Sequence, residues 1–314
     1  MVIAIRKNSI KVGLVTTWDE RCGVATYAKN LVSSLPEVDW RIIGRDEWGS
    51  GFNNVPSVGR DCDIVHWNHQ GGLFAGLTPS IVAQSCGRTI VTRQCIGPEE
   101  VFGAATIRVS HVPRDGYVHI PHGIVKVDDL PFTRLGGEKH SVVIGTAGIP
   151  FSGKGHVELV EIAGKIPGSA VNMVIPENPH ARNTDMISHC RGLASSLGVA
   201  FYCEAQWLDE QDVSRILNRS DVNVFYYTRP ANGVSGAVRM GLAALRPVIV
   251  SDHSQFQDLN GGVQVAHTLE EAARWITQYM EGTVTLPNQI EMVEDWRWKK
   301  IGQMYLQLYQ NLMN

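Results

Sequence analysis

The feature that most constrains the fold is a strand–helix–strand pattern between residues 221 and 252. The segments 221–228 (DVNVFYYT) and 246–252 (RPVIVSD) are rich in β-branched and aromatic residues, as buried strands are. Apolar residues between the two segments recur at helical spacing: Val234, Val238, Leu242 and Leu245. A strand, a helix and a second strand in this order predict a βαβ unit of a parallel sheet.

The turn that leads into this helix is a candidate phosphate site. Asn232 is placed to cap the helix, and Gly233 and Gly236 keep its first turn small and open. A helix N-terminus offers unpaired N–H groups and the positive end of a dipole, and both favour a phosphate. Most strand-to-helix turns hold no ligand, so a ligand-free turn is the alternative interpretation.

The same alternation of strands and helices runs through both halves of the chain. In the first half, strands are expected at residues 11–18, 40–44, 63–67, 89–92, 107–111 and 117–120. In the second half, strands are expected at residues 141–146, 170–175 and 199–203, before the unit described above. Helical segments separate most of these strands, which predicts an α/β fold of two Rossmann-like, doubly wound domains.

Chain length and one break in the pattern suggest the domain boundaries. A chain of 314 residues suits two domains of ordinary size. Residues 126–140 interrupt the alternation with charges, a proline and a pair of glycines. We therefore expect domains over residues 1–128 and 139–290, followed by a terminal segment, 291–314, that contains a last helix over 298–313.

Composition argues against several classes of protein. The formal charge of −3 provides no overall basic field that would favour nucleic acid. The six cysteines form no CxxC pair and no metal-ligand spacing, which favours reduced thiols and a cytoplasmic location. No apolar run approaches the roughly 18 residues that a membrane span needs, so no stable membrane insertion is expected.

Ligands are expected in a cleft between two facing domains, at loops that follow the carboxyl ends of strands. Arg21 and Gly23 end the first such loop, where Gly23 could let a phosphate approach backbone amides; a plain tight turn is the alternative. Lys154 follows the first strand of the second half and could reach a diphosphate; a solvated surface lysine is the alternative. The loop is not of the Walker type, because Gly155 follows Lys154 instead of preceding it.

Two histidines and one arginine are further candidates. His66 and His69 flank Trp67 and Asn68 and are expected to share a loop at the end of a strand, where they would either contact a substrate or serve the structure. Arg239 lies off the apolar stripe of its helix, so it is either a cation at the ligand site or an ordinary exposed arginine. No third ligand at suitable spacing accompanies the histidines, so no metal site is expected.

Six short motifs, in the correct order, resemble those of family-four-type glycosyltransferases with the GT-B fold. Residues 21–27 (RCGVATY) resemble the glycine loop and first helix, 63–66 (DIVH) the D-V-V-H strand, and 120–124 (IPHGI) the I-P-N-G-I/V marker. Lys154 and Gly155 resemble the K-G pair that grips the donor diphosphate, and 247–252 (PVIVSD) resembles P-V-I-A-S-D. Residues 298–309 resemble the closing helix, which in such folds crosses back to the N-terminal domain.

The chain departs from this family at several functional positions. Two family glutamates, one for the donor sugar and one for the nucleotide ribose, correspond to Asn232 and Met240. Asn232 can hydrogen-bond sugar hydroxyls, but Met240 cannot accept hydrogen bonds from a ribose. The usual arginine shortly before Lys154 is absent, and Arg239 is a candidate replacement. Gln94 replaces a family histidine.

The resemblance implies transfer of a sugar from a nucleotide-diphospho-sugar to an acceptor, with retention of anomeric configuration and with no metal or other cofactor. The residues expected to bind the donor are Gly23, Lys154, Asn232, Gly233, Val234, Ser235, Gly236 and Arg239. The residues expected to act in catalysis are His69, Gln94 and Lys154. The residues expected near the acceptor are Arg21, His66 and His69. The acceptor itself is a glycan, a lipid-linked sugar, a small molecule or a modified DNA base.

Three other functions are compatible with the same residues. A nucleotide-sugar epimerase-like enzyme shares the two-domain architecture. A catalytically silent carbohydrate- or nucleotide-binding module would explain the loss of both glutamates. A phage-type DNA-base glycosyltransferase is a special case, although a pI near 6.4 gives it no support.

Overall fold

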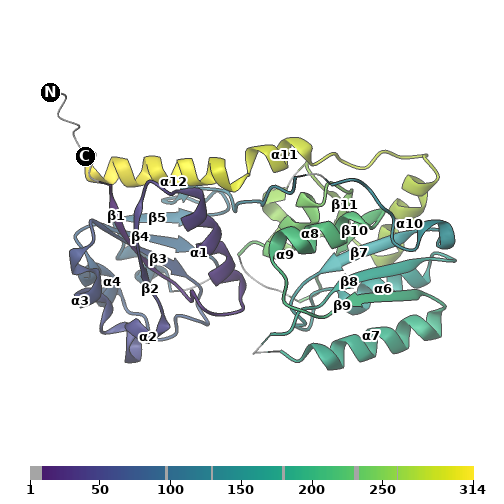
Figure 1. The fold of residues 1–314 in the computed structure, drawn as a ribbon, viewed down its shortest axis with the longest axis horizontal. Helices are drawn as coiled ribbons and strands as arrows, with labels where there is room; N and C mark the ends of the chain where they lie inside the picture. The colour runs from purple at the N-terminus through teal and green to yellow at the C-terminus, as the bar shows by residue number, and fades with distance from the viewer. Residues whose placement is uncertain (1–8, 96–97, 129, 179–180, 230–232, 260) are drawn as a thin grey trace. The chain divides into compact units, whose positions relative to one another are not determined.

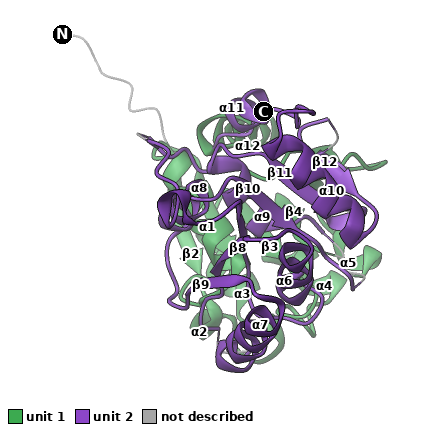
Figure 2. Ribbon diagram, turned by 90° about the vertical axis from the view of Figure 1, so that its right-hand side faces the viewer, with its two compact units in different colours: residues 1–123, 298–314 green, residues 124–297 purple. Residues whose placement is uncertain are grey.

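The fold is described from a computed structural model of the chain (Figure 1). It describes residues 9–95, 98–128, 130–178, 181–229, 233–259 and 261–314. The chain divides into two compact units, coloured separately in Figure 2. Unit 1 comprises Met1–Gly123 and Trp298–Asn314, and unit 2 comprises Ile124–Arg297. Each unit is built around its own parallel sheet.

Unit 1 contains a six-stranded parallel sheet in the order β2-β1-β3-β4-β5-β6. Its strands are β1 (Lys11–Val15), β2 (Asp39–Ile43), β3 (Ile64–His69), β4 (Thr89–Arg93), β5 (Ile107–Ser110) and β6 (Val118–His119). Its helices are α1 (Gly23–Ser34), α2 (Arg45–Trp48), η1 (Ser50–Phe52), α3 (Val55–Val58), η2 (Gly59–Asp61), α4 (Pro79–Ser85), α5 (Glu99–Gly103) and α12 (Trp298–Met313). The strand order reverses between β1 and β3, so the loops after these two strands meet at the carboxyl edge.

Strand β3 shows how the sheet of unit 1 is covered on both faces. Val65 and Trp67 point into a hydrophobic cluster that contains residues of α2, α3, α4 and α5. His66 and Asn68 point to the other face, where they bond to Tyr309 of α12 and to the Val24 carbonyl of α1. This division follows from the alternation of side chains along a strand, and it makes the sheet doubly wound.

Helix α12 packs against α1 in unit 1 through small residues and buried hydroxyls. A Cβ added at Gly302 would collide with the side chain of Ser34, so a glycine is needed where the two helices approach each other. The hydroxyls of Tyr27 and Tyr305 lie 2.8 Å apart in the same interface. Gly123 lies directly against the Trp298 indole, where a side chain would not fit.

Unit 2 contains a second six-stranded parallel sheet, in the order β12-β11-β10-β7-β8-β9. Its strands are β7 (Val143–Ala147), β8 (Ala170–Val174), β9 (Ala200–Glu204), β10 (Val222–Phe225), β11 (Val248–Ser251) and β12 (Gln264–Ala266). Its helices are η3 (Gly137–Lys139), α6 (His156–Gly164), α7 (Asn183–Leu197), α8 (Glu210–Asn218), α9 (Gly236–Ala243), η4 (Ser254–Leu259), α10 (Leu269–Met280) and α11 (Ile290–Asp295). The order reverses between β7 and β10, which brings their following loops together.

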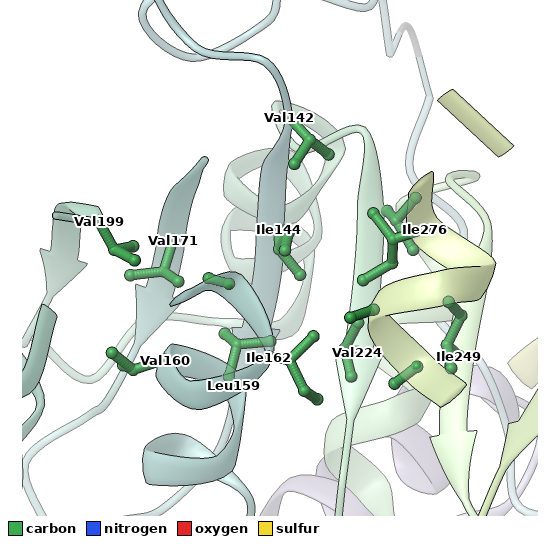
Figure 3. Packing of buried hydrophobic residues seen from close by; sticks show 14 of the residues in the cluster. Val142, Ile144, Leu159, Val160, Ile162, Val171, Val199, Val224, Ile249 and Ile276 are labelled. Carbon is green, nitrogen blue, oxygen red and sulfur yellow. The ribbon is translucent and has the colours of Figure 1, made fainter. Parts of the chain in front are cut away.

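The sheet of unit 2 is also buried on both faces. Ile249 of β11 belongs to a cluster formed with α6, α7 and α10, part of which is drawn in Figure 3. Its neighbours Val248 and Val250 belong to a second cluster, formed with α8, α9, η4 and α11. A strand buried on both faces reads as a continuous apolar run, as VIV does here.

The prediction of two doubly wound α/β units is confirmed by these sheets. The observed division differs from the expected domains of residues 1–128 and 139–290, because residues 124–138 and 291–297 also belong to unit 2. The backbone N–H of Ile124 donates to the Trp296 carbonyl at 2.7 Å, and Arg134 forms an ion pair with the buried Asp221. The first contact joins Ile124 to the residue after α11, and the second joins Arg134 of the expected linker to the residue before β10.

Strand β12 and helices α10 and α11 of unit 2 were not predicted, and neither were the short helices η3 and η4. Helix α10 has a recognisable start signal, because the Thr268 hydroxyl accepts a hydrogen bond from the backbone N–H of Glu271 at 3.0 Å. The six cysteines are free thiols. No helix in the described part of the chain combines the length and apolar character needed to span a bilayer.

Candidate functional site

Lys154 lies in the turn between β7 and α6, at the carboxyl edge of the second sheet. Its Nζ donates a hydrogen bond to Oε1 of Gln255 at 3.1 Å and lies 4.1 Å from the centre of the Tyr227 ring. Neither of these described contacts carries a negative charge. Burial lowers the pKa of the Lys154 ammonium to about 8. The alternative of a solvated surface lysine is therefore wrong.

Glycines on both sides determine the path of the chain at Lys154. Gly155 has a φ of +85°, and a Cβ at this position would lie 2.5 Å from the carbonyl oxygen of Tyr226. Gly153 has a φ of +82° and lies against Arg229. Only glycine adopts such angles at little cost, so the backbone can turn tightly above β10 and direct Lys154 toward Tyr227.

The N-terminus of α9 faces the same region. Ser235 is the N-cap, and its Oγ accepts from the backbone N–H of Val238 at 3.4 Å and bonds to the Tyr227 hydroxyl at 2.8 Å. The expectation that Asn232 caps this helix is wrong, because the helix begins at Gly236, directly after Ser235. Asn232 lies outside the described residues, so its contact with a donor sugar stays a prediction.

The residues before Ser235 form the last part of this turn. Gly233 has a φ of +92°, a conformation that a side chain would disfavour. Val234 and Gly236 are half-buried. Binding of a phosphate by Gly233, Val234, Ser235 and Gly236 stays a prediction.

Arg239 is not exposed. Its side chain is 2% accessible and forms an ion pair with Asp258, which is 3% accessible. Nη1 of Arg239 also donates to the carbonyl of Ser235 at 2.8 Å. Arg239 thus lies buried next to the start of α9 and supports this turn, so the alternative of an exposed arginine is wrong. The expected contact of Arg239 with a donor stays a prediction.

Helix η4 connects these groups. The carbonyl of Gln255 accepts from the backbone N–H of Ser235 at 3.3 Å, while its side chain holds Lys154. Asp258, one turn later in η4, holds Arg239. Neither Gln255 nor Asp258 was predicted from the sequence as part of the site. Gln255 follows strand β11 closely, and this strand-end position was an available signal; nothing in the sequence marks Asp258 as a partner of Arg239.

Met240 was expected, from the motif resemblance alone, to replace a ribose-binding glutamate, and this correspondence stays a prediction. The side chain is half-buried and packs against the hydrophobic cluster around α8, α9 and η4. It thus contributes apolar surface at this position of α9, where a carboxylate would be expected in the family.

His66 and His69 lie within β3 and on opposite faces of the sheet, so the expectation that they share a loop is wrong. The ring nitrogens of His66 lie 2.8 Å from the Tyr309 hydroxyl and 2.7 Å from Oγ1 of Thr92. Burial lowers the pKa of His66 to about 3. Both ring nitrogens are occupied by protein groups, which assigns His66 to the packing of α12.

His69 lies on the other face, among aromatic rings. Its ring centre is 4.9 Å from that of Phe102 and 5.4 Å from that of Phe74. Burial, aided by the positive charge of Arg93, lowers the pKa of His69 to about 4. The side chain is 1% exposed, and its Nδ1 has no hydrogen-bond partner among the described residues. His69 is therefore neutral and enclosed.

A row of polar side chains crosses the carboxyl edge of the first sheet. Asn68, near the end of β3, donates from Nδ2 to Oγ1 of Thr16 at 3.3 Å and to the carbonyl of Val24 at 2.9 Å. Gln94, after β4, donates from Nε2 to Oδ1 of Asn68 at 2.6 Å. Nε2 of His111, after β5, lies 3.3 Å from Oε1 of Gln94. Asn68 and His111 were not singled out from sequence, although Asn68 directly follows the predicted strand 63–67 and His111 ends the predicted strand 107–111.

Arg21 and Gly23 lie on the surface where α1 begins. Cys22 between them is buried and its sulfur lies 3.1 Å from Oγ1 of Thr17. A Cβ added at Gly23 would meet nothing within 4 Å, so the protein itself leaves open space there. Within the described ranges, no group of three or more His, Cys, Asp and Glu side chains is arranged to hold a metal ion.

Comparisons with solved structures cover nearly the whole chain. HepE of Anabaena, in complex with UDP and glucose, aligns over 96% of this chain and 100% of its own with 13% identity and a TM-score of 0.72. Sucrose-phosphate synthase of Thermosynechococcus elongatus aligns over 97% and 99% with 14% identity and a TM-score of 0.70. A glycosyltransferase of Rickettsia africae aligns over 98% and 99% with 14% identity and a TM-score of 0.65.

The chain has the GT-B fold. No family model matches its sequence, and no curated protein matches it. The likeness is therefore one of architecture at low identity, and the residues of the two sheet edges carry the functional argument.

Proposed function

We propose that this protein is a glycosyltransferase that moves a sugar from a nucleotide-diphospho-sugar to an acceptor. The observation that carries the proposal is Lys154, a partly buried cation whose described contacts are an amide oxygen and an aromatic face. A buried ammonium without a negative partner is costly, and a diphosphate would supply the missing charge.

The groups around Lys154 suit the departure of a nucleoside diphosphate. As the bond between the sugar and the diphosphate breaks, negative charge grows on the leaving oxygen, and fixed donors stabilise it. Lys154 and the backbone N–H groups at the start of α9 are such donors. Arg239 is proposed to support these donors without touching the diphosphate, because its ion pair with Asp258 and its hydrogen bond to the Ser235 carbonyl hold this turn in place.

Relatives in structure point to the same class of donor. One crystal structure of HepE contains UDP-glucose, and a trehalose-phosphate synthase of Burkholderia xenovorans, with a TM-score of 0.67, is described as UDP-forming. We extend this to a nucleotide-sugar donor for unit 2. Retention of configuration and independence from metals are further parts of the proposal and rest on the motif resemblance.

Unit 1 is proposed to bind the acceptor at its carboxyl edge, near Arg21 and Gln94, while Gly23 stays a predicted contact of the donor. His66 is excluded from this role, because both of its ring nitrogens bond to protein hydroxyls. His69 would reach an acceptor only if the aromatic rings around it moved. The chemical class of the acceptor stays open.

The test is turnover of nucleotide sugars by the purified chain. UDP-glucose and a panel of other nucleotide sugars are incubated with the native protein, and release of the free nucleoside diphosphate is measured, including slow hydrolysis. We expect release from at least one donor and a loss of at least tenfold in Lys154→Ala. Lys139→Ala, which removes an exposed lysine of unit 2, is the matched control and should change nothing.

Three outcomes would contradict the proposal. Conversion of the donor into an isomeric nucleotide sugar would indicate an epimerase-like enzyme. Tight binding without turnover across the panel would indicate a silent binding module. Full activity in Lys154→Ala would show that Lys154, at the carboxyl edge of the second sheet, takes no part in the reaction.

A further inference from the structure

The hydrogen-bond directions along the polar row of unit 1 are fixed by a backbone carbonyl. The side chain of Asn68 is 1% exposed, and one end of its amide lies 2.9 Å from the carbonyl oxygen of Val24. A carbonyl oxygen only accepts hydrogen bonds, so this end of Asn68 is the NH₂ group. The opposite end, which faces Gln94, is therefore Oδ1.

The same reasoning determines the orientation of Gln94. Oδ1 of Asn68 lies 2.6 Å from the Gln94 amide and can only accept, so Gln94 presents its NH₂ group there. The Gln94 oxygen, Oε1, consequently faces Nε2 of His111 at 3.3 Å. An oxygen without a hydrogen can only accept, so a hydrogen bond in this position requires a proton on Nε2 of His111.

The other nitrogen of the His111 ring faces a second fixed acceptor. Nδ1 lies 2.9 Å from the backbone carbonyl oxygen of Ile120, so it too must carry a proton to form a hydrogen bond. A neutral imidazole has one ring proton and would leave one lone pair directed at an oxygen. An imidazolium has two ring protons and satisfies both contacts.

We propose that His111 is doubly protonated at neutral pH and acts as a positioning residue that holds Gln94 in one orientation. In that orientation Gln94 donates one N–H to Asn68, and its second N–H has no partner among the described residues. Gln94 is half-buried at the carboxyl edge of the sheet, where a substrate could reach that N–H. This last step rests on the proposed function; the protonation of His111 does not.

Some surroundings of His111 favour the neutral form of its ring, and others favour the charged form. The ring is 2% exposed, and burial favours the neutral form. His122 lies 5.4 Å from it by ring centres, Tyr27 of α1 lies 5.1 Å away, and His66 lies on the same face of the sheet. The two oxygen acceptors at fixed positions favour the charged form, because hydrogen bonds from an ionised donor are stronger than neutral ones.

Three titratable neighbours of His111 are uncharged and therefore do not repel a positive charge on its ring. His66 is neutral, since burial lowers its pKa to about 3. Burial raises the pKa of the Tyr27 and Tyr305 hydroxyls, to about 12 for Tyr305, so both remain uncharged. Nε2 of His119 donates a hydrogen bond to the backbone carbonyl of His111 at 3.2 Å, so this contact does not involve the His111 ring.

Nuclear magnetic resonance of the histidine rings tests the proposal without any sugar substrate. Ring ¹⁵N and ¹H spectra of the native protein at pH 7 are assigned by comparison with His111→Asn. We expect two ring N–H protons on His111. Gln94→Met removes the acceptor at Nε2, so the titration of His111 should move to lower pH by more than one unit, which is a loss of more than tenfold in proton affinity.

Two further variants complete the design. Gln94→Glu keeps an oxygen acceptor facing His111 and should retain both ring protons. Gln84→Met, at an exposed position on α4, is the control and should leave the spectrum of His111 unchanged. A single ring proton on His111 in the native protein would overturn the proposal. Equal titration in the native protein and in Gln94→Met would also overturn it, because Gln94 would then not be coupled to the ring.

Discussion

At the scale of single residues, the candidate donor site is defined by Lys154, whose partly buried charge lowers the stability of unit 2. Lys154 is positioned by Gly155 on one side and by Gln255 and Tyr227 on the other. None of these groups compensates a positive charge with a negative one. We infer that a partly buried charge without a negative partner serves ligand binding and not stability. The effect of its removal on stability and on binding can be measured.

Lys154→Met should stabilise the protein while it weakens donor binding. Burial lowers the pKa of Lys154 from its ordinary value of 10.5 to about 8. Each pKa unit corresponds to about 1.4 kcal/mol, and partial exposure reduces the effect, so we expect a gain of about 1–3 kcal/mol at pH 7. Urea unfolding of both proteins measures it.

The pH dependence of that gain has a definite sign. The unfolded chain holds its proton up to pH 10.5, whereas the native state releases it near pH 8. Between these values the native protein gains stability as pH rises, so the advantage of Lys154→Met should shrink there. An advantage that stayed constant from pH 7 to pH 10 would contradict the assigned pKa.

Binding of a nucleoside diphosphate should weaken as pH rises above about 8, because the neutral amine of Lys154 attracts phosphate poorly. Lys154→Arg keeps its charge over this range and should bind with little pH dependence. Isothermal titration between pH 6.5 and 9.5 compares the two proteins. Parallel pH profiles would show that another group controls binding.

Single residues also show where sequence reasoning reached its limit. The positions of Lys154 and Gly155 at a strand end are readable from the local pattern. The burial of Arg239 is not, because it depends on Asp258, which a separate strand and turn bring near. The separation of His66 from His69 depends on where β3 ends, and strand ends are poorly marked in sequence.

At the scale of elements, the site of unit 2 depends on how closely the turn before α6 passes over β10. The strands and helices of this unit were largely predictable, since their apolar periodicity is strong. The start of α9 was predicted too early, because Asn232 and Ser235 are both good capping residues and only tertiary contacts choose between them. Tyr227 and Gln255 make that choice through Ser235.

Gly155→Ala should destabilise unit 2 strongly. Its added Cβ would lie 2.5 Å from the Tyr226 carbonyl oxygen at a φ of +85°, so clash and backbone strain add together. Gly282→Ala is the matched control, because Gly282 has a φ of +71° and open space around it. We expect a loss of about 1 kcal/mol in the control and at least about 2 kcal/mol more in Gly155→Ala.

Denaturant unfolding of both variants gives this difference directly. The comparison separates the cost of the left-handed backbone, which the two glycines share, from the cost of the close approach to β10. Equal losses in the two variants would mean that the turn can move away from Tyr226. The position of Lys154 would then not be set by this contact.

At the scale of the whole chain, each unit carries its own core and its own polar sheet edge. Unit 1 is completed by the last residues of the chain, because α12 packs on α1 and bonds through Tyr305 and Tyr309 to groups of the first sheet. The resemblance of residues 298–309 to a closing helix made α12 predictable. The hydroxyl network beneath it was not, since it joins residues more than 200 positions apart.

Gly302→Ala should destabilise unit 1 and leave nucleotide binding by unit 2 unchanged. The added methyl group would collide with Ser34 of α1. Gly192→Ala, in the exposed part of α7, adds the same methyl group to a helix with nothing within 4 Å. Helix propensity alone favours alanine by about 1 kcal/mol, so the control should gain stability while Gly302→Ala loses it. Thermal unfolding and nucleotide titration of both variants provide the test, and a gain in both would contradict the close packing of α12.

The central claim is that unit 2 binds a nucleoside diphosphate through Lys154 and the start of α9. Isothermal titration of UDP, GDP and ADP into the native protein, Lys154→Ala and Lys139→Ala tests it most directly. We predict that at least one nucleotide binds the native protein and Lys139→Ala equally, and binds Lys154→Ala at least tenfold more weakly, as the loss of a charge-assisted contact worth about 1.5–3 kcal/mol requires. If none of the three nucleotides binds, or if Lys154→Ala binds as tightly as the native protein, unit 2 does not bind a nucleoside diphosphate through Lys154.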